Sequence, residues 1–333
     1  MQISKHKTTK TIIIISDSYV WKKYQNYILK MLKKNNSVEI IKWIGPRGEK
    51  LKSIKNYELA TNHILSSSHD INKNSTLIAI GGGAVSDFAG FIASTLLRGI
   101  KWTIIPTTLL SMVDASIGGK TALNTAAGKN LLGTFYPPSK IIVDLHFLKS
   151  LSMLDYYSGY GEIIKYAFLS SKINKLLKRL DKVHVNEKII NECIAYKNKI
   201  VKQDPREEKG IRTILNFGHT FGHAFEKAFN LPHGIAVLWG IEFILRHFSK
   251  NQKLLSTFYD FTTNIANIKI DLYKKKANPS LILNFICKDK KRSSSTHIKL
   301  VTLEKIGKPR VIEVTINDIR KKLIKEFGHE YIC

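Results

Sequence analysis

Three histidines, His219, His223 and His233, stand within fifteen residues of one another. His219 and His223 are four residues apart, so on a helix they share one face, one turn apart. Neutral imidazole is a common ligand of divalent metals, and Glu162 in the segment GYGEIIK could add a carboxylate. One carboxylate with two histidines leaves a coordination position open, which is typical of a catalytic zinc site. Spacing alone leaves open which two histidines bind metal.

A run of three glycines, Gly81 to Gly83, follows one expected strand and begins an expected helix. Glycine lets the backbone approach a phosphate closely, and the N–H groups at a helix N-terminus attract negative charge. The run departs from G-x-G-x-x-G because Ser86 takes the last glycine's place. Its position still favours a nucleotide over a plain turn, since ligands of open α/β sheets bind at the carboxyl ends of strands.

The segment from Ile105 to Phe135 places isolated charges among glycines and small apolar residues. Charged side chains among apolar neighbours are more often paired or functional than without a role. The segment therefore predicts binding chemistry rather than an ordinary loop. Its candidate residues are Thr107, Thr108, Asp114, Lys120, Lys129 and Asn130.

Two kinds of architecture position these groups. In residues 1–150, β-branched runs (11–16, 37–44, 77–80, 102–105, 141–143) alternate with helical patterns (19–34, 51–66, 84–97). This alternation predicts a mostly parallel sheet covered on both faces. From residue 151 helical stretches dominate (153–170, 172–203, 213–229, 235–250, 253–266), with few strand candidates before 298–303 and 310–314. The sequence thus predicts an α/β half and a mainly helical half.

The 333-residue chain has 53 Lys and Arg against 26 Asp and Glu, a net charge of +27, and its pI is about 9.8. This net charge suggests nucleic acid or an anionic membrane as a partner. However, only nine of the 53 basic residues are Arg, and proteins that recognise bases usually do so with the planar, two-pronged guanidinium group of Arg. Cys193, Cys287 and Cys333 stand far apart, which is typical of a reducing compartment. No apolar run reaches spanning length without a charge. We expect a soluble cytoplasmic protein with neither a nucleic-acid nor a membrane partner.

Long motifs occur in a fixed order: GGGAVSDFAGFIAS, LRG, PTTLLSMVDASIGGKTALN, GKNLLGTFYPP, GEIIKYA, GIRTILNFGHTFGHAFE and PHGIAV. Together they resemble the 3-dehydroquinate synthase family over roughly residues 45–240, with weaker similarity in KDKKR (288–292) and IGKPRVIEV. The resemblance implies a Rossmann-like NAD-binding α/β domain, residues 1–150, and a helical metal- and substrate-binding domain, residues 151–333. It also implies one divalent metal, Zn²⁺ or Co²⁺, and a homodimer.

The resemblance further implies residue roles. It assigns the metal to Glu162, His219 and His233, and proton transfer to His223. The NAD-binding positions are Gly48, Glu49, Lys50, Leu51, Lys52, Gly83, Ala84, Val85, Ser86, Asp87, Thr107, Thr108, Lys120, Lys129, Phe147, Leu148, Lys149 and Ser150. The substrate-side positions are Asp114, Lys120, Asn130, Lys197, Arg212 and Asn216, with Arg98 and either Lys290 or Lys291 near the substrate phosphate.

The implied reaction converts 3-deoxy-D-arabino-heptulosonate 7-phosphate to 3-dehydroquinate and phosphate, within chorismate biosynthesis. NAD⁺ oxidises a hydroxyl, phosphate is eliminated, the hydride returns and the carbocycle closes, so the net reaction is a lyase reaction. A metal suits this chemistry as a Lewis acid, and a histidine can transfer protons at neutral pH. Cationic side chains would bind the substrate's carboxylate and phosphate.

Three segments depart from the family pattern. The Glu that usually follows the third metal histidine is absent, because Gly234 is followed by Ile235. The segment from Asp204 to Gly210 is one residue longer than usual before Arg212, and the family's T-L-P-x-R-E has become SLSMLD.

Other readings remain open. Another sugar phosphate cyclase would keep the NAD and metal sites but change its substrate contacts, and the Arg212 and Asn216 pattern favours dehydroquinate. A metal-dependent polyol dehydrogenase of the related fold would release NADH. The charge alone suggests a nucleic-acid-binding protein, and the departures suggest a non-catalytic remnant. The positive surface is also consistent with steering an anionic sugar phosphate.

Overall fold

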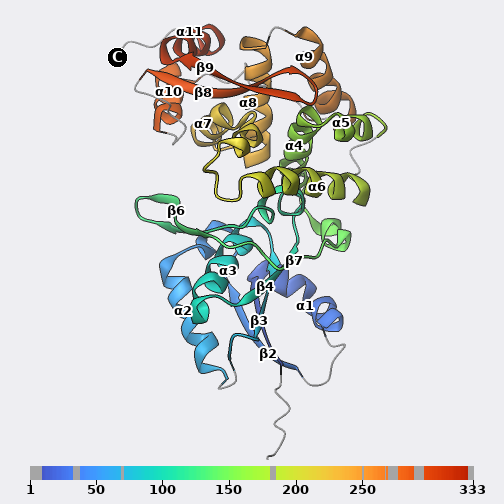
Figure 1. Cartoon of the computed structure of the whole chain (residues 1–333), viewed down its shortest axis with the longest axis vertical. Helices are drawn as coiled ribbons and strands as arrows, with labels where there is room; N and C mark the ends of the chain where they lie inside the picture. The colour runs from blue at the N-terminus through green and yellow to red at the C-terminus, as the bar shows by residue number, and fades with distance from the viewer. Residues whose placement is uncertain are drawn as a thin grey trace, which may run out of the picture. The chain divides into compact units, whose positions relative to one another are not determined.

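The computed structural model describes residues 10–32, 38–68, 71–180, 185–249, 251–266, 268, 277–288 and 296–328 (Figure 1). The chain divides into two compact units, Met1–Leu151 and Ser152–Cys333. Lys290 and Lys291 lie outside the described residues.

The first unit is built on a parallel five-stranded sheet of order β2-β1-β3-β4-β7. Its strands are β1 (Lys10–Asp17), β2 (Val38–Gly45), β3 (Thr76–Gly81), β4 (Lys101–Pro106) and β7 (Lys140–Ile141). Its helices are α1 (Ser18–Leu32), α2 (Ile54–Ser66) and α3 (Gly83–Thr95). The predicted α/β class is confirmed.

Both faces of this sheet are covered, which explains why its strands are continuous apolar runs. Ile13 and Ile15 pack in one cluster with Ile64 of α2 and Phe88 of α3. Ile14 points to the opposite face and is also fully buried. Figure 1 shows α2 and α3 on one side of the sheet and α1 on the other.

The strand order reverses beside β1, because β2 lies on one side of it and β3 on the other. Ligands of open α/β sheets bind outside the carboxyl ends of strands at such a switch point. β3 ends at Gly81, so the glycine run lies at this position.

An antiparallel hairpin of β5 (Lys120–Thr125) and β6 (Gly128–Phe135) was not predicted from the sequence. Its Lys, Asn and Gly residues have weak strand preference and obscure the alternation. The hairpin carries three of the candidate polar residues, namely Lys120, Lys129 and Asn130. Short helical turns complete the unit: η1 (Gly48–Leu51), η2 (Leu96–Arg98), η3 (Ser111–Ala115) and η4 (Leu145–Ser150).

The second unit is mainly helical. Its elements are α4 (Met153–Leu169), α5 (Ser171–Leu177), α6 (Glu187–Gln203), η5 (Ile211–Asn216), α7 (His219–Phe229), α8 (His233–His247), α9 (Gln252–Tyr259), η6 (Asp260–Ile265), α10 (Pro279–Lys288), the antiparallel strands β8 (His297–Lys305) and β9 (Lys308–Thr315), and α11 (Ile316–Phe327). The helix expected over 172–203 is two helices, and α10 and α11 were not anticipated. None of the helices in the described ranges is long and apolar enough to cross a membrane.

Helices α4 and α8 lie side by side in Figure 1 and approach at two glycines. A Cβ added to Gly234 would lie 1.7 Å from the Ser158 carbonyl oxygen, and one added to Gly161 would lie 2.3 Å from the Gly234 carbonyl oxygen. The Gly234 N–H donates to Ser158 Oγ at 3.1 Å. Glu162 follows Gly161 and His233 precedes Gly234, so this backbone contact positions both side chains.

Candidate functional site

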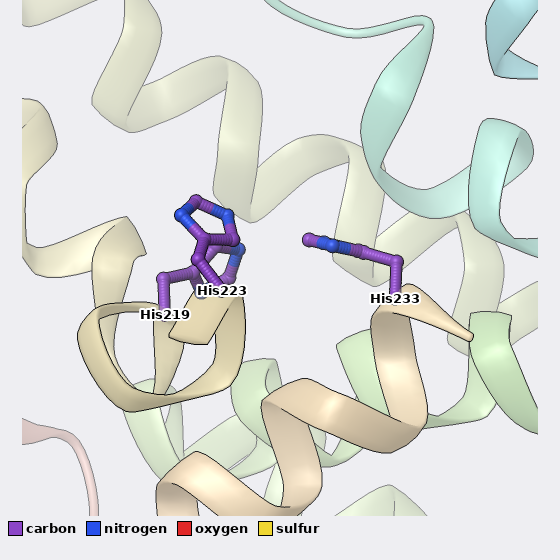
Figure 2. Close-up of side chains that lie close together, drawn as sticks. All are labelled: His219, His223 and His233. Carbon is purple, nitrogen blue, oxygen red and sulfur yellow. The ribbon is translucent and has the colours of Figure 1, made fainter. Parts of the chain in front are cut away.

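The three histidines come together where α7 and α8 meet (Figure 2). His219 and His223 extend from successive turns of α7, and His233 is the first residue of α8. One ring nitrogen from each lies within 4.8 Å of the others. The cluster therefore offers a set of imidazoles from which a metal site can be built.

Glu162 adds a carboxylate from α4. Its Oε1 lies 3.5 Å from His219 Nε2 and 3.4 Å from His233 Nε2, and the residue is 0% exposed. Ligand bonds of about 2.0–2.1 Å in tetrahedral geometry place two ligand atoms about 3.4 Å apart. Glu162 Oε1 thus stands at ligand-to-ligand distance from both imidazoles, and the donor set fits a divalent metal.

The other ring nitrogen of each of these two histidines has an acceptor. His219 Nδ1 lies 3.2 Å from the Phe217 carbonyl oxygen, and His233 Nδ1 lies 3.0 Å from Glu226 Oε2. A carbonyl oxygen only accepts, so His219 Nδ1 carries the proton and Nε2 keeps its lone pair. Metal-binding histidines usually show this arrangement.

The pKa of His233 lies well above the usual value for histidine. Burial by itself lowers its pKa, but the hydrogen bonds and charges of Glu162 and Glu226 outweigh burial and raise the pKa to about 9. A metal at this position therefore competes with a proton on His233.

Lys165 is a site residue that the sequence analysis missed. It follows Glu162 by three residues on α4, and its Nζ forms an ion pair with Glu162 Oε2. Lys165 is 1% exposed, and a lysine is almost never that buried unless it is paired. The i,i+3 spacing within GEIIKYA was the signal that could have revealed it.

Arg212, on η5, is 4% exposed and tightly oriented. Its Nη1 donates to the Pro205 carbonyl oxygen at 3.0 Å, and its Nε lies 3.2 Å from Glu207 Oε1. The buried Asp204 carboxylate accepts backbone N–H groups of Lys209 at 3.1 Å, Ile211 at 3.0 Å and Arg212 at 3.4 Å. Burial favours a raised pKa for Asp204, but these backbone hydrogen bonds prevail and lower it.

Two more predicted substrate-side residues lie in the second unit. Lys197 is a buried residue of α6, 7% exposed, and Asn216 is a half-buried residue at the end of η5.

The glycine turn of the first unit begins α3, with Gly82 as the N-cap and Gly83 as the first helical residue. The Thr107 N–H donates to the Gly81 carbonyl oxygen at 2.9 Å. A Cβ on Gly82 would lie 3.1 Å from Thr108 Cγ2, so the turn and the end of β4 are in close contact. The first N–H groups of α3 have no acceptor within the helix and can bind an anion.

Lys52 connects three parts of the first unit. Its Nζ lies 2.6 Å from Asp87 Oδ2 on α3, contacts Asn130 Oδ1 on β6, and lies 3.8 Å from Glu49 Oε2. Lys52 is 1% exposed. Burial raises the pKa of Asp87 although Lys52 opposes this. The charge of Lys52 is paired with Asp87. Lys52 therefore holds α3, β6 and Glu49 together, and its charge is not available to pair with a ligand.

The remaining predicted residues are placed as follows. Arg98, Lys120, Lys129 and Lys50 are exposed, and Arg98 has a positive φ of 61°. Asp114 is half-buried on η3. On η4, Phe147 is buried and Lys149 is exposed. The hydroxyl of Ser150 contacts that of Tyr24.

Solved structures define the class of protein with this fold. The chain is similar to 2-deoxy-scyllo-inosose synthase complexed with carbaglucose-6-phosphate, NAD⁺ and Co²⁺, with a TM-score of 0.83, 25% identity, and coverage of 96% of this chain and 91% of that one. An iron-containing alcohol dehydrogenase from Thermotoga maritima shares the fold at a TM-score of 0.60 and 15% identity, covering 96% and 92% of the two chains. The fold is therefore that of the sugar phosphate cyclases and the iron-containing alcohol dehydrogenases.

Sequence relatives define the family within that class. The family models described as 3-dehydroquinate synthase N-terminal and C-terminal match residues 42–158 and 159–292. A 3-dehydroquinate synthase from Staphylococcus haemolyticus is 36% identical over 95% of this chain and 89% of its own length. One from Pelagibacter ubique is 42% identical over 82% and 79%. The chain belongs to the 3-dehydroquinate synthase family, as its motifs predicted.

Proposed function

We propose that the chain converts 3-deoxy-D-arabino-heptulosonate 7-phosphate to 3-dehydroquinate and phosphate, as a carbon–oxygen lyase acting on phosphate. The observation that carries this proposal is the position of Glu162 Oε1, 3.4–3.5 Å from the Nε2 atoms of His219 and His233. The identity of the substrate is inferred from membership of the 3-dehydroquinate synthase family. We propose that the active form is a homodimer and that it acts in the cytoplasm.

The divalent metal, zinc or cobalt, is assigned to Glu162, His219 and His233. When bound, such a metal supplies a Lewis acid for substrate oxygens. Relatives of the same fold have been solved with Co²⁺ or Zn²⁺, which supports this assignment. The hydrogen bonds from Nδ1 of His219 and His233 leave both Nε2 atoms suited to bind a cation.

His223 is assigned to proton transfer. It lies one helical turn from His219, with the two ring centroids 5.3 Å apart, and is half-buried. A histidine with a pKa near neutrality can both accept and donate a proton, which phosphate elimination and ring closure each require.

NAD is assigned to the glycine turn and the residues around it. When bound, NAD supplies a reversible hydride acceptor, and it ends the cycle unchanged. The amide N–H groups of Gly83, Ala84 and Val85, at the start of α3, are suited to bind a pyrophosphate, and Thr107 and Thr108 adjoin them. Lys52 keeps helix α3 and the β6 strand at a defined separation through Asp87 and Asn130.

The substrate carries a carboxylate and a phosphate, and the assigned substrate residues are mostly cationic or amide groups. They are Arg98, Asp114, Lys120, Asn130, Lys197, Arg212 and Asn216. Arginine binds a carboxylate in a fixed, two-pronged geometry. The contacts of Arg212 with Pro205 and Glu207 restrict its orientation before substrate binds.

The test is an assay of the full chain with the heptulosonate phosphate, NAD and Zn²⁺ or Co²⁺, following phosphate and dehydroquinate together. We expect both products in equal amounts without net NADH. His219→Ala should lose metal and turnover, whereas His223→Ala should retain metal and lose turnover. Absence of phosphate release, or phosphate without dehydroquinate, would overturn the proposal, and steady NADH accumulation would indicate a dehydrogenase instead.

A further inference from the structure

We propose that Glu226 is the positioning residue for His233. Its carboxylate sets the tautomer and ring orientation that present His233 Nε2 to a divalent metal, and it thereby sets the metal affinity of the site. The inference rests on the proposed function in one respect, namely that a metal binds at Glu162, His219 and His233.

The fold brings Glu226 to His233 through a short connection. Helix α7 ends at Phe229, Asn230 adopts a left-handed conformation with φ of 51°, and α8 begins at His233. The Leu231 N–H donates to the Glu226 carbonyl oxygen at 3.2 Å, which closes this turn. The chain thus folds back on itself, and Glu226 Oε2 lies 3.0 Å from His233 Nδ1.

Glu226 lies on the same side of α7 as His219 and His223. It follows His223 by three residues and His219 by seven, and this spacing keeps all three on one helical face. It is the sole acidic residue in the sequence of α7. The segment His233–Val237 reads HGIAV and contains no carboxylate, so the acceptor for His233 Nδ1 comes from the preceding helix.

The two imidazoles of the proposed site have different acceptors. His219 Nδ1 faces a neutral backbone carbonyl, whereas His233 Nδ1 faces a charged carboxylate. A hydrogen bond to a carboxylate is stronger than one to a carbonyl and makes the opposite nitrogen a more basic ligand. The side chains of His233 and Glu226 are 28% and 30% exposed, so solvent only partly screens this interaction.

A purely structural role for Glu226 makes a different prediction. If the contact only fastened the corner between α7 and α8, its loss would lower the stability of the metal-free protein and leave the intrinsic metal affinity unchanged. Glu226→Gln removes the charge and keeps an oxygen acceptor, whereas Glu226→Ala removes the acceptor as well. The two variants therefore separate charge from hydrogen bonding.

The experiment measures Zn²⁺ affinity of the full chain by competition with a chromophoric chelator, together with the visible absorption spectrum of the Co²⁺ form. We expect Glu226→Gln to weaken affinity about 10-fold and Glu226→Ala about 100-fold, with an altered Co²⁺ spectrum. Glu192→Gln is the matched control, because Glu192 pairs with Lys172 at 2.6 Å in the same unit. It removes the same charge and should change neither readout.

Wild-type affinity and spectrum in both Glu226 variants, with metal still lost in His219→Ala, would overturn this inference alone. Failure of the unmodified chain to bind any divalent metal would overturn both this inference and the metal assignment. If Glu226→Ala does not fold, the comparison of Glu226→Gln with Glu192→Gln still decides the question.

Discussion

Replacing Gly234 with alanine should force α4 and α8 apart and strongly weaken metal binding. The new Cβ would lie 1.7 Å from the Ser158 carbonyl oxygen. Real Cβ atoms essentially never lie closer than 3.0 Å to such an atom, so the separation would have to increase by 1.3 Å. The nearest atoms all belong to the backbone of Ser158, so no side-chain rotation relieves the overlap. The helices must therefore move by at least about this amount.

That displacement is large compared with the tolerance of a metal site. His233 immediately precedes Gly234 and moves with it, whereas Glu162 belongs to α4. Ligand distances in metal sites are defined to within about 0.2 Å, several times less than the required shift. We expect a loss of Zn²⁺ affinity greater than 100-fold, together with a loss of about 1–3 kcal/mol in the free energy of unfolding from overpacking.

The assay is chelator competition for Zn²⁺, with thermal unfolding of the metal-free variant alongside. Gly161→Ala should have a smaller effect, because its Cβ would lie 2.3 Å from the Gly234 carbonyl oxygen and requires a shift of only 0.7 Å to reach the same limit. Ala236→Gly, at a fully buried position of α8, is the control. It costs about 1 kcal/mol of helix propensity without displacing a helix. Wild-type affinity in Gly234→Ala, or equal metal loss in Ala236→Gly, would refute the reasoning.

Three further predictions concern charged side chains. Lys52→Met leaves Asp87 without its cation, so NAD titrations should show weaker binding and thermal scans a lower melting temperature; unchanged NAD affinity would contradict the positioning role. In the metal-free protein, His233 titrates at about 9 against about 6.5 when unfolded, so its contribution is complete below pH 6.5 and is lost as pH rises through 9. Urea unfolding at pH 6 to 10 should show this loss, and His233→Ala should not. Asp204→Ala removes the acceptor that orders the loop before Arg212, so KM for the substrate should rise while Zn²⁺ affinity stays unchanged; an unaltered KM would argue against that role.

Much of the architecture followed from local sequence patterns. The Ile-rich run at 11–16 predicted β1, because a strand buried on both faces needs continuous β-branched residues. The four-residue spacing of His219 and His223 predicted a shared helical face, which α7 provides. The glycine run predicted a strand-to-helix turn, and β3 and α3 meet there. Periodicity did not separate α5 from α6, and it missed the β5–β6 hairpin because polar residues and glycines obscure its alternation.

The sequence by itself determined most of the elements, the family and the kinds of groups available for chemistry. Tertiary structure alone decided that Glu226 meets His233 and that Lys52 meets Asp87 and Asn130, and it set the distance between Glu162 and His233. Periodicity reports only the few residues that share a turn or a strand face, whereas these contacts depend on how closely whole elements pack. The 1.7 Å that would separate a Cβ at position 234 from a backbone oxygen shows how closely α4 and α8 approach, and that approach places Glu162 beside His233.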